Sequence, residues 1–316
     1  MSLPPWFSLR RAKTADGGWI GMQAGRDRVL VACAKTGPDG KVRISQQQCF
    51  AGAERLSALL QWQKQSAPKG SRTNLLLEPS EYQILQIDAP AVEEAERKSA
   101  VRWQMKDLID FPPDEAALDC MSVPGEVSAN APQRLLSVVA RKSVITSWMG
   151  HWHAAKLSLS SIDIGEMALR NLAVLASGEQ AVAFLHIGWD TTHLIIVWRE
   201  SLCTFRQLSV GGEQLLILDE MDRAQLFERF ALEIQRTTDA FGRQFSAATL
   251  TRVWLSSVVD APGVAIALSG QVDLHVEPFV LGDWVTFEDP PSEGDVEQRL
   301  DYTLAIGAAL RVEAVE

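Results

Sequence analysis

The chain has 316 residues and a formal net charge of −10, with 47% hydrophobic and 22% charged residues. These values are ordinary for a folded protein, and they exclude a disordered, a collagen-like and a disulfide-stapled chain. At roughly 150 residues per domain, the length predicts two domains. The acidic balance argues against a nucleic-acid-binding protein, because such domains usually carry a basic face.

Neither a membrane-spanning helix nor an export signal is expected. The chain has no run of about 18 apolar residues, and its start lacks the apolar core of a signal peptide. The short apolar and basic segment Trp6–Arg11 is interpreted either as a contact with anionic lipid or as a frayed terminus. The four cysteines form no CxxC pair, and His151 and His153 point to different faces of a helix, so no metal site is predicted.

The first part of the chain alternates between strand and helix patterns. Two strands within Trp19–Ala34, joined by a turn at Gly25, and a third at Val42–Phe50 form a meander. Further strands are predicted at Thr73–Leu77, Tyr82–Asp88, Leu118–Val123, Leu135–Arg141 and Ser158–Ile164. Helices are predicted at Ala53–Gln65, Ala91–Ile109, Ser143–Ala155 and Glu166–Ala176. The second of these helices carries Val101, Met105 and Leu108 at the spacing of one apolar face.

The same pattern then returns in the second part. A second three-strand meander is predicted at Val182–Ile187, His193–Arg199 and Leu202–Val210. Helices are predicted at Gly211–Met221, Ala224–Phe245, Gly263–Leu268 and Leu300–Leu310, strands at Thr251–Ser257 and Val272–Val276, and a loop at Val285–Gly294. Two halves of this kind predict a duplicated α/β fold with a cleft where they meet.

The predicted boundaries follow from this repeat. The first half is residues 1–80, completed by residues 158–178 and the closing segment 299–316. Residues 81–157 form a small α+β insertion, and residues 179–298 form the second half.

The duplicated meander resembles the actin and sugar-kinase superfamily, which has an RNase H-like core and includes the FtsA-like proteins. This resemblance implies that the turns of both halves cradle ATP phosphates, because glycines let backbone N–H groups approach an anion. The residues implied for such a site are Gly25, Gly188, Thr191, Thr192, Gly211 and Gly212. The alternative is that the glycines serve tight turns and the threonines simply enter a strand.

Five stretches resemble more narrowly the PilM family of type IV pilus proteins, and within it the MshI branch of the mannose-sensitive haemagglutinin (MSHA) pilus. They are, in chain order, RWQMKDLIDFPPDEAALD, HIGWDTTHLIIV, RQLSVGGEQL, EIQRTTDAF and LDYTLAIGAALR. The first lies in the inserted subdomain, and the resemblance places its Arg102, Trp103 and Lys106 near the surface that binds a partner. The alternative is that Trp103 belongs to the core and both basic residues are solvated.

The departures from the family pattern predict a degenerate nucleotide site. Gln23 and His186 stand where the family's two turns carry Asp, and neither replaces a carboxylate at a Mg²⁺ site. Ser256 and Ser257 stand in place of a Gly-Gly turn against adenine. We therefore expect no enzymatic activity and no bound metal, with ATP binding without hydrolysis as the remaining option. The sequence identifies no Ser, Cys or Asp partner that would make His186 a general base.

Three functions remain open at this stage. The first is a cytoplasmic scaffold at the inner face of the inner membrane, which binds the cytoplasmic tail of a PilN-like inner-membrane protein. The second is an ATP-binding or ATP-hydrolysing actin-like protein or kinase, and the third is a soluble relative of the cytoplasmic domain of GspL from type II secretion. Glu233 and Arg236 are interpreted either as lining a cleft or as a salt-bridged helix face.

Overall fold

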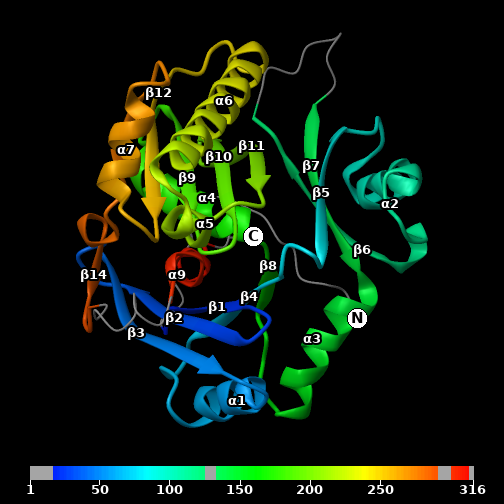
Figure 1. Ribbon diagram of the computed structural model, residues 1–316. Helices are drawn as coiled ribbons and strands as arrows, with labels where there is room; N and C mark the ends of the chain where they lie inside the picture. Colours follow the sequence, from blue (N-terminus) through cyan, green and yellow to red (C-terminus); the bar gives the residue numbers. More distant parts are fainter. Residues whose placement is uncertain (1–16, 125–132, 291–299, 313–316) are drawn as a thin grey trace.

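The computed structural model describes residues 17–124, 133–290 and 300–312. They form three β-sheets, and two of these face each other across a pair of helices (Figure 1). No helix among the described residues is long and apolar enough to span a bilayer.

The first sheet has six strands and contains the first meander. Its strands, in spatial order, are β14 (Val285–Phe287), β3 (Val42–Ala51), β2 (Arg28–Thr36), β1 (Trp19–Ala24), β4 (Arg72–Leu76) and β8 (Ser161–Asp163). β1 and β2 pair antiparallel, as do β2 and β3, whereas β4 runs parallel to β1. Helix α1 (Arg55–Gln65) packs against β2 and β3.

The second sheet has five strands and contains the second meander. Its strands, in spatial order, are β11 (Ser201–Leu208), β10 (Thr192–Trp198), β9 (Ala181–Ile187), β12 (Leu250–Ser257) and β13 (His275–Pro278). Every residue of β9 and β10 is buried, as expected for central strands covered on both faces. Its helices are α5 (Gly212–Ile217), α6 (Glu220–Gln244) and α7 (Ala261–Ser269).

Two helices hold these sheets together. α4 (Gly165–Ser177) packs on β9 and β10, and α9 (Thr303–Ala309) packs on β1, β2 and α4. The approach of α9 is close, because a Cβ atom at Gly21 of β1 would collide with the Ala305 carbonyl. Glycine at this position therefore lets the closing helix lie directly on the sheet.

The inserted segment forms a separate sheet in the order β5-β7-β6 (Figure 1). These strands are β5 (Tyr82–Asp88), β7 (Arg134–Arg141) and β6 (Ala116–Ser122), with α2 (Glu94–Gln104) packed on β6. α3 (Lys142–Ala154) leads back to the first half, where its Trp152 is buried with residues of β1 and β2. The insertion is thus joined to the first half by shared core.

The predicted elements are confirmed in order and type, with three corrections. The helix predicted at Ala91–Ile109 ends at Gln104, so Leu108 lies beyond it and is 54% exposed instead of facing the core. The predicted loop Val285–Gly294 begins with β14, which joins the sheet of the first half, although the predicted boundary placed it in the second. The break between α5 and α6 falls at Leu218 and Asp219, because the Asp219 carboxylate accepts a hydrogen bond from the Asp222 N–H and caps α6.

Candidate functional site

The glycine turns at the ends of β9 and β11 pack on each other. The Gly212 N–H donates to the Gly188 carbonyl at 2.8 Å, and the Gly188 N–H donates to the Thr191 carbonyl at 2.9 Å. A Cβ atom at Gly211 would collide with the Trp189 carbonyl. Close approach of two turns accounts for glycine here, and these N–H groups already have acceptors inside the protein.

The other residues implied for phosphate binding are also engaged internally. The Gly25 N–H donates to the Arg28 carbonyl at 2.9 Å, which closes the turn between β1 and β2. The Thr192 hydroxyl donates to the Val210 carbonyl at 2.7 Å, and the Thr191 hydroxyl lies 3.2 Å from His193 Nε2. The structure thus brings the turns of the second half together, but their donors are directed at protein atoms.

His186 has two partners that the sequence did not reveal, so the prediction that it lacks Ser and Asp partners is wrong. Its imidazole is buried at the end of β9, where Nδ1 lies 3.2 Å from the Ser256 hydroxyl. Nε2 lies 3.2 Å from Oδ2 of Asp301, which lies two residues before the start of α9. Because β9 belongs to the second sheet and α9 lies on the first, this pair connects the two halves.

The electrostatics favour an ionised Asp301. Burial opposes ionisation, but His186 and the hydrogen bonds from His186 and Thr303 outweigh it and lower the pKa of the Asp301 carboxyl. The Thr303 N–H, the first of α9, donates to Asp301 Oδ1 at 3.0 Å, so the carboxylate lies at the start of this helix. A negative charge at a helix start is favourable.

A second buried polar group lies beside this pair and links helix α4 to two of the sheets. The Tyr82 hydroxyl of β5 donates to Glu166 Oε2 of α4 at 2.6 Å, and Glu166 Oε1 lies 3.9 Å from His193 Nδ1 of β10. Burial raises the pKa of Glu166, and it lowers the pKa of His193 to about 4, with a further contribution from His186. A neutral His193 is therefore expected at neutral pH.

These residues do not fit a Mg²⁺–nucleotide site well. The carboxylate at the second turn, Asp301, is committed to His186, and no group of three metal-ligating side chains occurs among the described residues. Ser256 is turned toward His186, and the Ser257 hydroxyl donates to the Val259 carbonyl at 2.6 Å. One acceptor is left over: Gln23 Oε1 is buried and makes no hydrogen bond to the part of the chain that is described.

The residues that the resemblance placed near a partner lie on α2 and the short turn after it. Val101 and Met105 point to the core of the insertion, and Trp103, on the opposite side of the helix, is 68% exposed. Arg102 is half-buried and Lys106 is exposed. The alternative that Trp103 belongs to the core is therefore wrong, and an exposed tryptophan of this kind is typical of contact surfaces.

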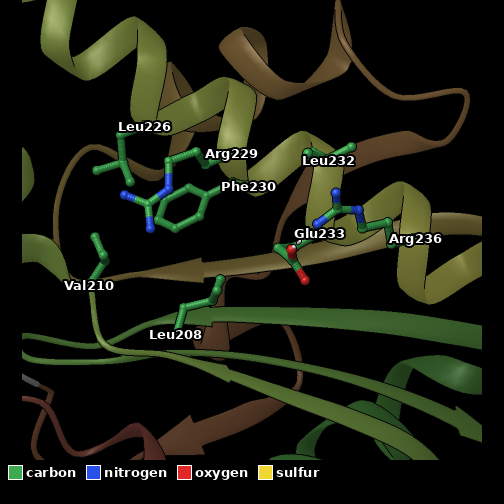
Figure 2. Close-up of a pocket in the computed structure, with 8 residues that line it drawn as sticks. All are labelled: Leu208, Val210, Leu226, Arg229, Phe230, Leu232, Glu233 and Arg236. Carbon is green, nitrogen blue, oxygen red and sulfur yellow. Dashed lines mark hydrogen bonds and ion pairs between the residues drawn. The ribbon is translucent and has the colours of Figure 1, made fainter.

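Glu233 and Arg236 lie together on α6 at the rim of a pocket of about 170 Å³ (Figure 2). Arg236 donates to Glu233 at 3.1 Å, so both interpretations of these residues hold at once. The pocket lies between α6 and the end of β11, where Val210 joins it to the Gly211-Gly212 turn.

Two solved structures resemble the whole chain. The first, described as a PilM–PilN type IV pilus biogenesis complex, is 17% identical with a TM-score of 0.68, covering 95% of this chain and 98% of that chain. The second is the cytoplasmic domain of EpsL, an inner-membrane component of the type II secretion system of Vibrio cholerae. It is 10% identical with a TM-score of 0.50, covering 92% of this chain and 94% of that one. None of the curated proteins compared with the chain matches it.

A third solved structure, from Bacteroides thetaiotaomicron, is described as an actin-like ATPase fold of unknown function, with 9% identity, coverage of 90% and 95%, and a TM-score of 0.48. The duplicated sheets and the likeness to the PilM–PilN structure confirm the predicted actin-like fold. The family model described as type IV pilus assembly protein PilM matches residues 52–251, which is more than half of the chain. The chain therefore belongs to the PilM family of type IV pilus assembly proteins.

Proposed function

We propose that the protein is a cytoplasmic scaffold of a type IV pilus assembly complex, of the MSHA type, and that it binds the cytoplasmic tail of a PilN-like inner-membrane protein. Membership of the PilM family supports the pilus role, and the similar structure is described as a complex of PilM with PilN. The observation that favours a binding role over catalysis is the buried His186–Asp301 pair. His186 stands where the family's second turn carries a carboxylate, and a Mg²⁺-dependent phosphoryl transfer needs such a negative charge.

The inserted subdomain is the surface that we assign to the PilN-like tail. Trp103 is exposed on α2, and Lys106 follows it on the same outer side. A large aromatic side chain that is already ordered on a helix loses little conformational freedom on binding, so it suits an anchor for a short peptide.

We expect Trp103→Ala together with Lys106→Glu to reduce recovery of the PilN-like protein at least about tenfold, because the loss of one aromatic anchor typically costs about 2 kcal/mol. The measurement is co-purification of the membrane protein encoded beside the gene. Ile266→Ala, which alters a side chain 76% exposed on α7, is the matched control. Equal recovery by the parent and the double variant would place the tail elsewhere.

Surface variants test this assignment better than removal of residues 81–156. That deletion would take Trp152 out of the core of the first half and Tyr82 away from Glu166. A loss of binding by a chain damaged in this way would be uninformative.

We further expect no hydrolysis of ATP above the buffer background. Phosphoryl transfer depends on placed Mg²⁺ and on groups that stabilise transferred charge, and Gln23 and His186 supply neither. A steady-state phosphate-release assay with Mg²⁺ and ATP tests this. Turnover of about 1 s⁻¹ or more that disappears in Gly188→Phe would contradict it, because a side chain at that position faces His186 and Asp301.

Binding of ATP without turnover is the second candidate, and one observation favours it. Gln23 Oε1 is a buried acceptor without a partner among residues 17–124, 133–290 and 300–312, and a donor group or water from outside the protein would satisfy it. A thermal-shift titration with ATP, with and without Mg²⁺, tests for such binding. A shift that Gln23→Leu abolishes would support it.

A further inference from the structure

The edge of the second sheet carries an unassigned surface. Among the strands that the structure describes, β11 is the end strand of this sheet and pairs with β10 alone. α6 lies across the same end, and the 170 Å³ pocket opens between them (Figure 2). Its apolar wall consists of Leu208, Val210, Leu226, Phe230 and Leu232. An end strand beside an apolar pocket offers both backbone groups and room for a side chain.

Two arginines of α6 border this pocket, and a third follows along the same side of the helix. Arg229, Arg236 and Arg243 are spaced seven residues apart, so they lie on nearly the same side of the helix and drift by about 20° at each step. All three are exposed, and Figure 2 shows the first two at the pocket rim. Arg206 of β11 is exposed too and, two residues from Leu208, points to the same face of the strand.

The positive charge of this stripe is only partly used within the protein. Arg236 pairs with Glu233 at 3.1 Å, and Arg206 donates to the neighbouring Phe205 carbonyl at 2.8 Å. Arg229 and Arg243 form no ion pair with any residue that the structure describes. On a chain of net charge −10, guanidinium groups gathered beside an apolar pocket suit an external anion.

We propose that this β11–α6 surface, formed by Arg206, Leu208, Val210, Arg229, Leu232, Arg236 and Arg243, binds an extended acidic segment of a partner protein. The segment pairs its backbone with the free edge of β11 and places one apolar side chain in the pocket. Its carboxylates then meet the guanidinium groups of α6. A nucleic acid or a lipid surface would use the charges but neither the pocket nor the strand edge, so the observations favour a peptide.

This surface lies on the second sheet, whereas the PilN-like tail is assigned to the insertion, so each proposal fails or stands separately. The probe is a fluorescently labelled peptide of alternating Glu and Val with one central Leu, titrated with the full chain and followed by anisotropy. We expect Arg229→Glu/Arg236→Glu to weaken binding at least about tenfold. Arg26→Glu/Lys35→Glu, which reverses two exposed charges in the first half of the chain, is expected to leave affinity within about twofold.

Two further measurements separate the parts of the surface. Leu232→Ser changes a side chain that is 43% exposed. We expect it to weaken binding of the Leu-containing probe about fivefold, and to weaken much less the binding of a probe with Ala in place of the central Leu. A probe methylated on alternate backbone nitrogens is expected to lose binding, because it cannot pair with β11.

Several results would overturn the proposal. They are equal binding of a probe with Lys in place of Glu, equal weakening by the control pair, or no binding of the acidic probe to the parent. Competition by single-stranded DNA or phosphatidylglycerol vesicles that is stronger than competition by unlabelled peptide would also overturn it and assign the arginines to those ligands.

Discussion

Replacing His186 with aspartate is expected to lower the free energy of unfolding by about 3–5 kcal/mol, the range for leaving a buried charge without its partner. The imidazole now faces the ionised, buried Asp301. A carboxylate in its place would put two like charges together, and one of them would have to take up a proton. Urea unfolding at pH 7, followed by tryptophan fluorescence, measures the loss.

A double-mutant cycle assigns this loss to the pair. We expect His186→Gln to cost about 3 kcal/mol, because it leaves a buried carboxylate unpaired. His186→Gln/Asp301→Asn should recover most of that loss, because two neutral amides can hydrogen-bond to each other. Additive losses would show that His186 stabilises the fold through Ser256 and local packing instead.

The same position tests whether a phosphate turn survives. Gln23→Asp together with His186→Asp supplies the carboxylates that the family pattern carries, and Asp301 adds a third acid at the second turn. If these turns still form a cation site, Mg²⁺ should restore part of the lost stability and raise nucleotide affinity. No effect of Mg²⁺ on this variant, with His186→Gln as the control, would mean that the turns are structural only.

The fold was predictable from the sequence because strand and helix periods are local signals. The two meanders, the insertion and the closing helix were all found from alternating patterns and turn residues. The misplaced parts depend on tertiary contacts. β14 consists of only Val285–Phe287 and is a strand because it pairs with β3. α2 ends at Gln104, although Leu108 continues the apolar spacing of a helix.

The candidate site was less predictable. The sequence shows that Gln23 and His186 stand where the family pattern carries acidic residues. It does not show that the carboxylate of Asp301 lies at the second turn instead. Asp301 lies 115 positions after His186, and nothing in the motif before α9 indicates that it points back to β9. The β11–α6 surface depends on how α6 lies across an end strand, although the spacing of its arginines can be read from the sequence.

The protein is also expected to lose stability as the pH falls from 6.5 to 4, by about 3 kcal/mol from His193 alone, since each pKa unit corresponds to about 1.4 kcal/mol. The unfolded chain protonates this histidine below its ordinary pKa of 6.5, whereas burial and the nearby His186 lower the folded pKa to about 4. In that interval the unfolded state binds more protons, so stability falls with pH, and below about 4 His193 contributes no further change.

Its neighbours determine how this acid effect is tested. Burial raises the pKa of Glu166, so the folded state takes up that proton first and Glu166 opposes the loss. Asp301 has a lowered pKa, so its contribution is lost only below about pH 3.8, outside the interval of His193.

The unfolding free energy should be measured at pH 7, 6, 5 and 4.5 for the parent, His193→Gln and Glu166→Gln. We expect the unfolding free energy to depend less steeply on pH in His193→Gln, because this variant removes the proton uptake of the unfolded state. We expect a steeper dependence on pH in Glu166→Gln, because this variant removes the group that opposes the loss. The same slope in the parent and in His193→Gln would show that His193 is already charged in the folded protein.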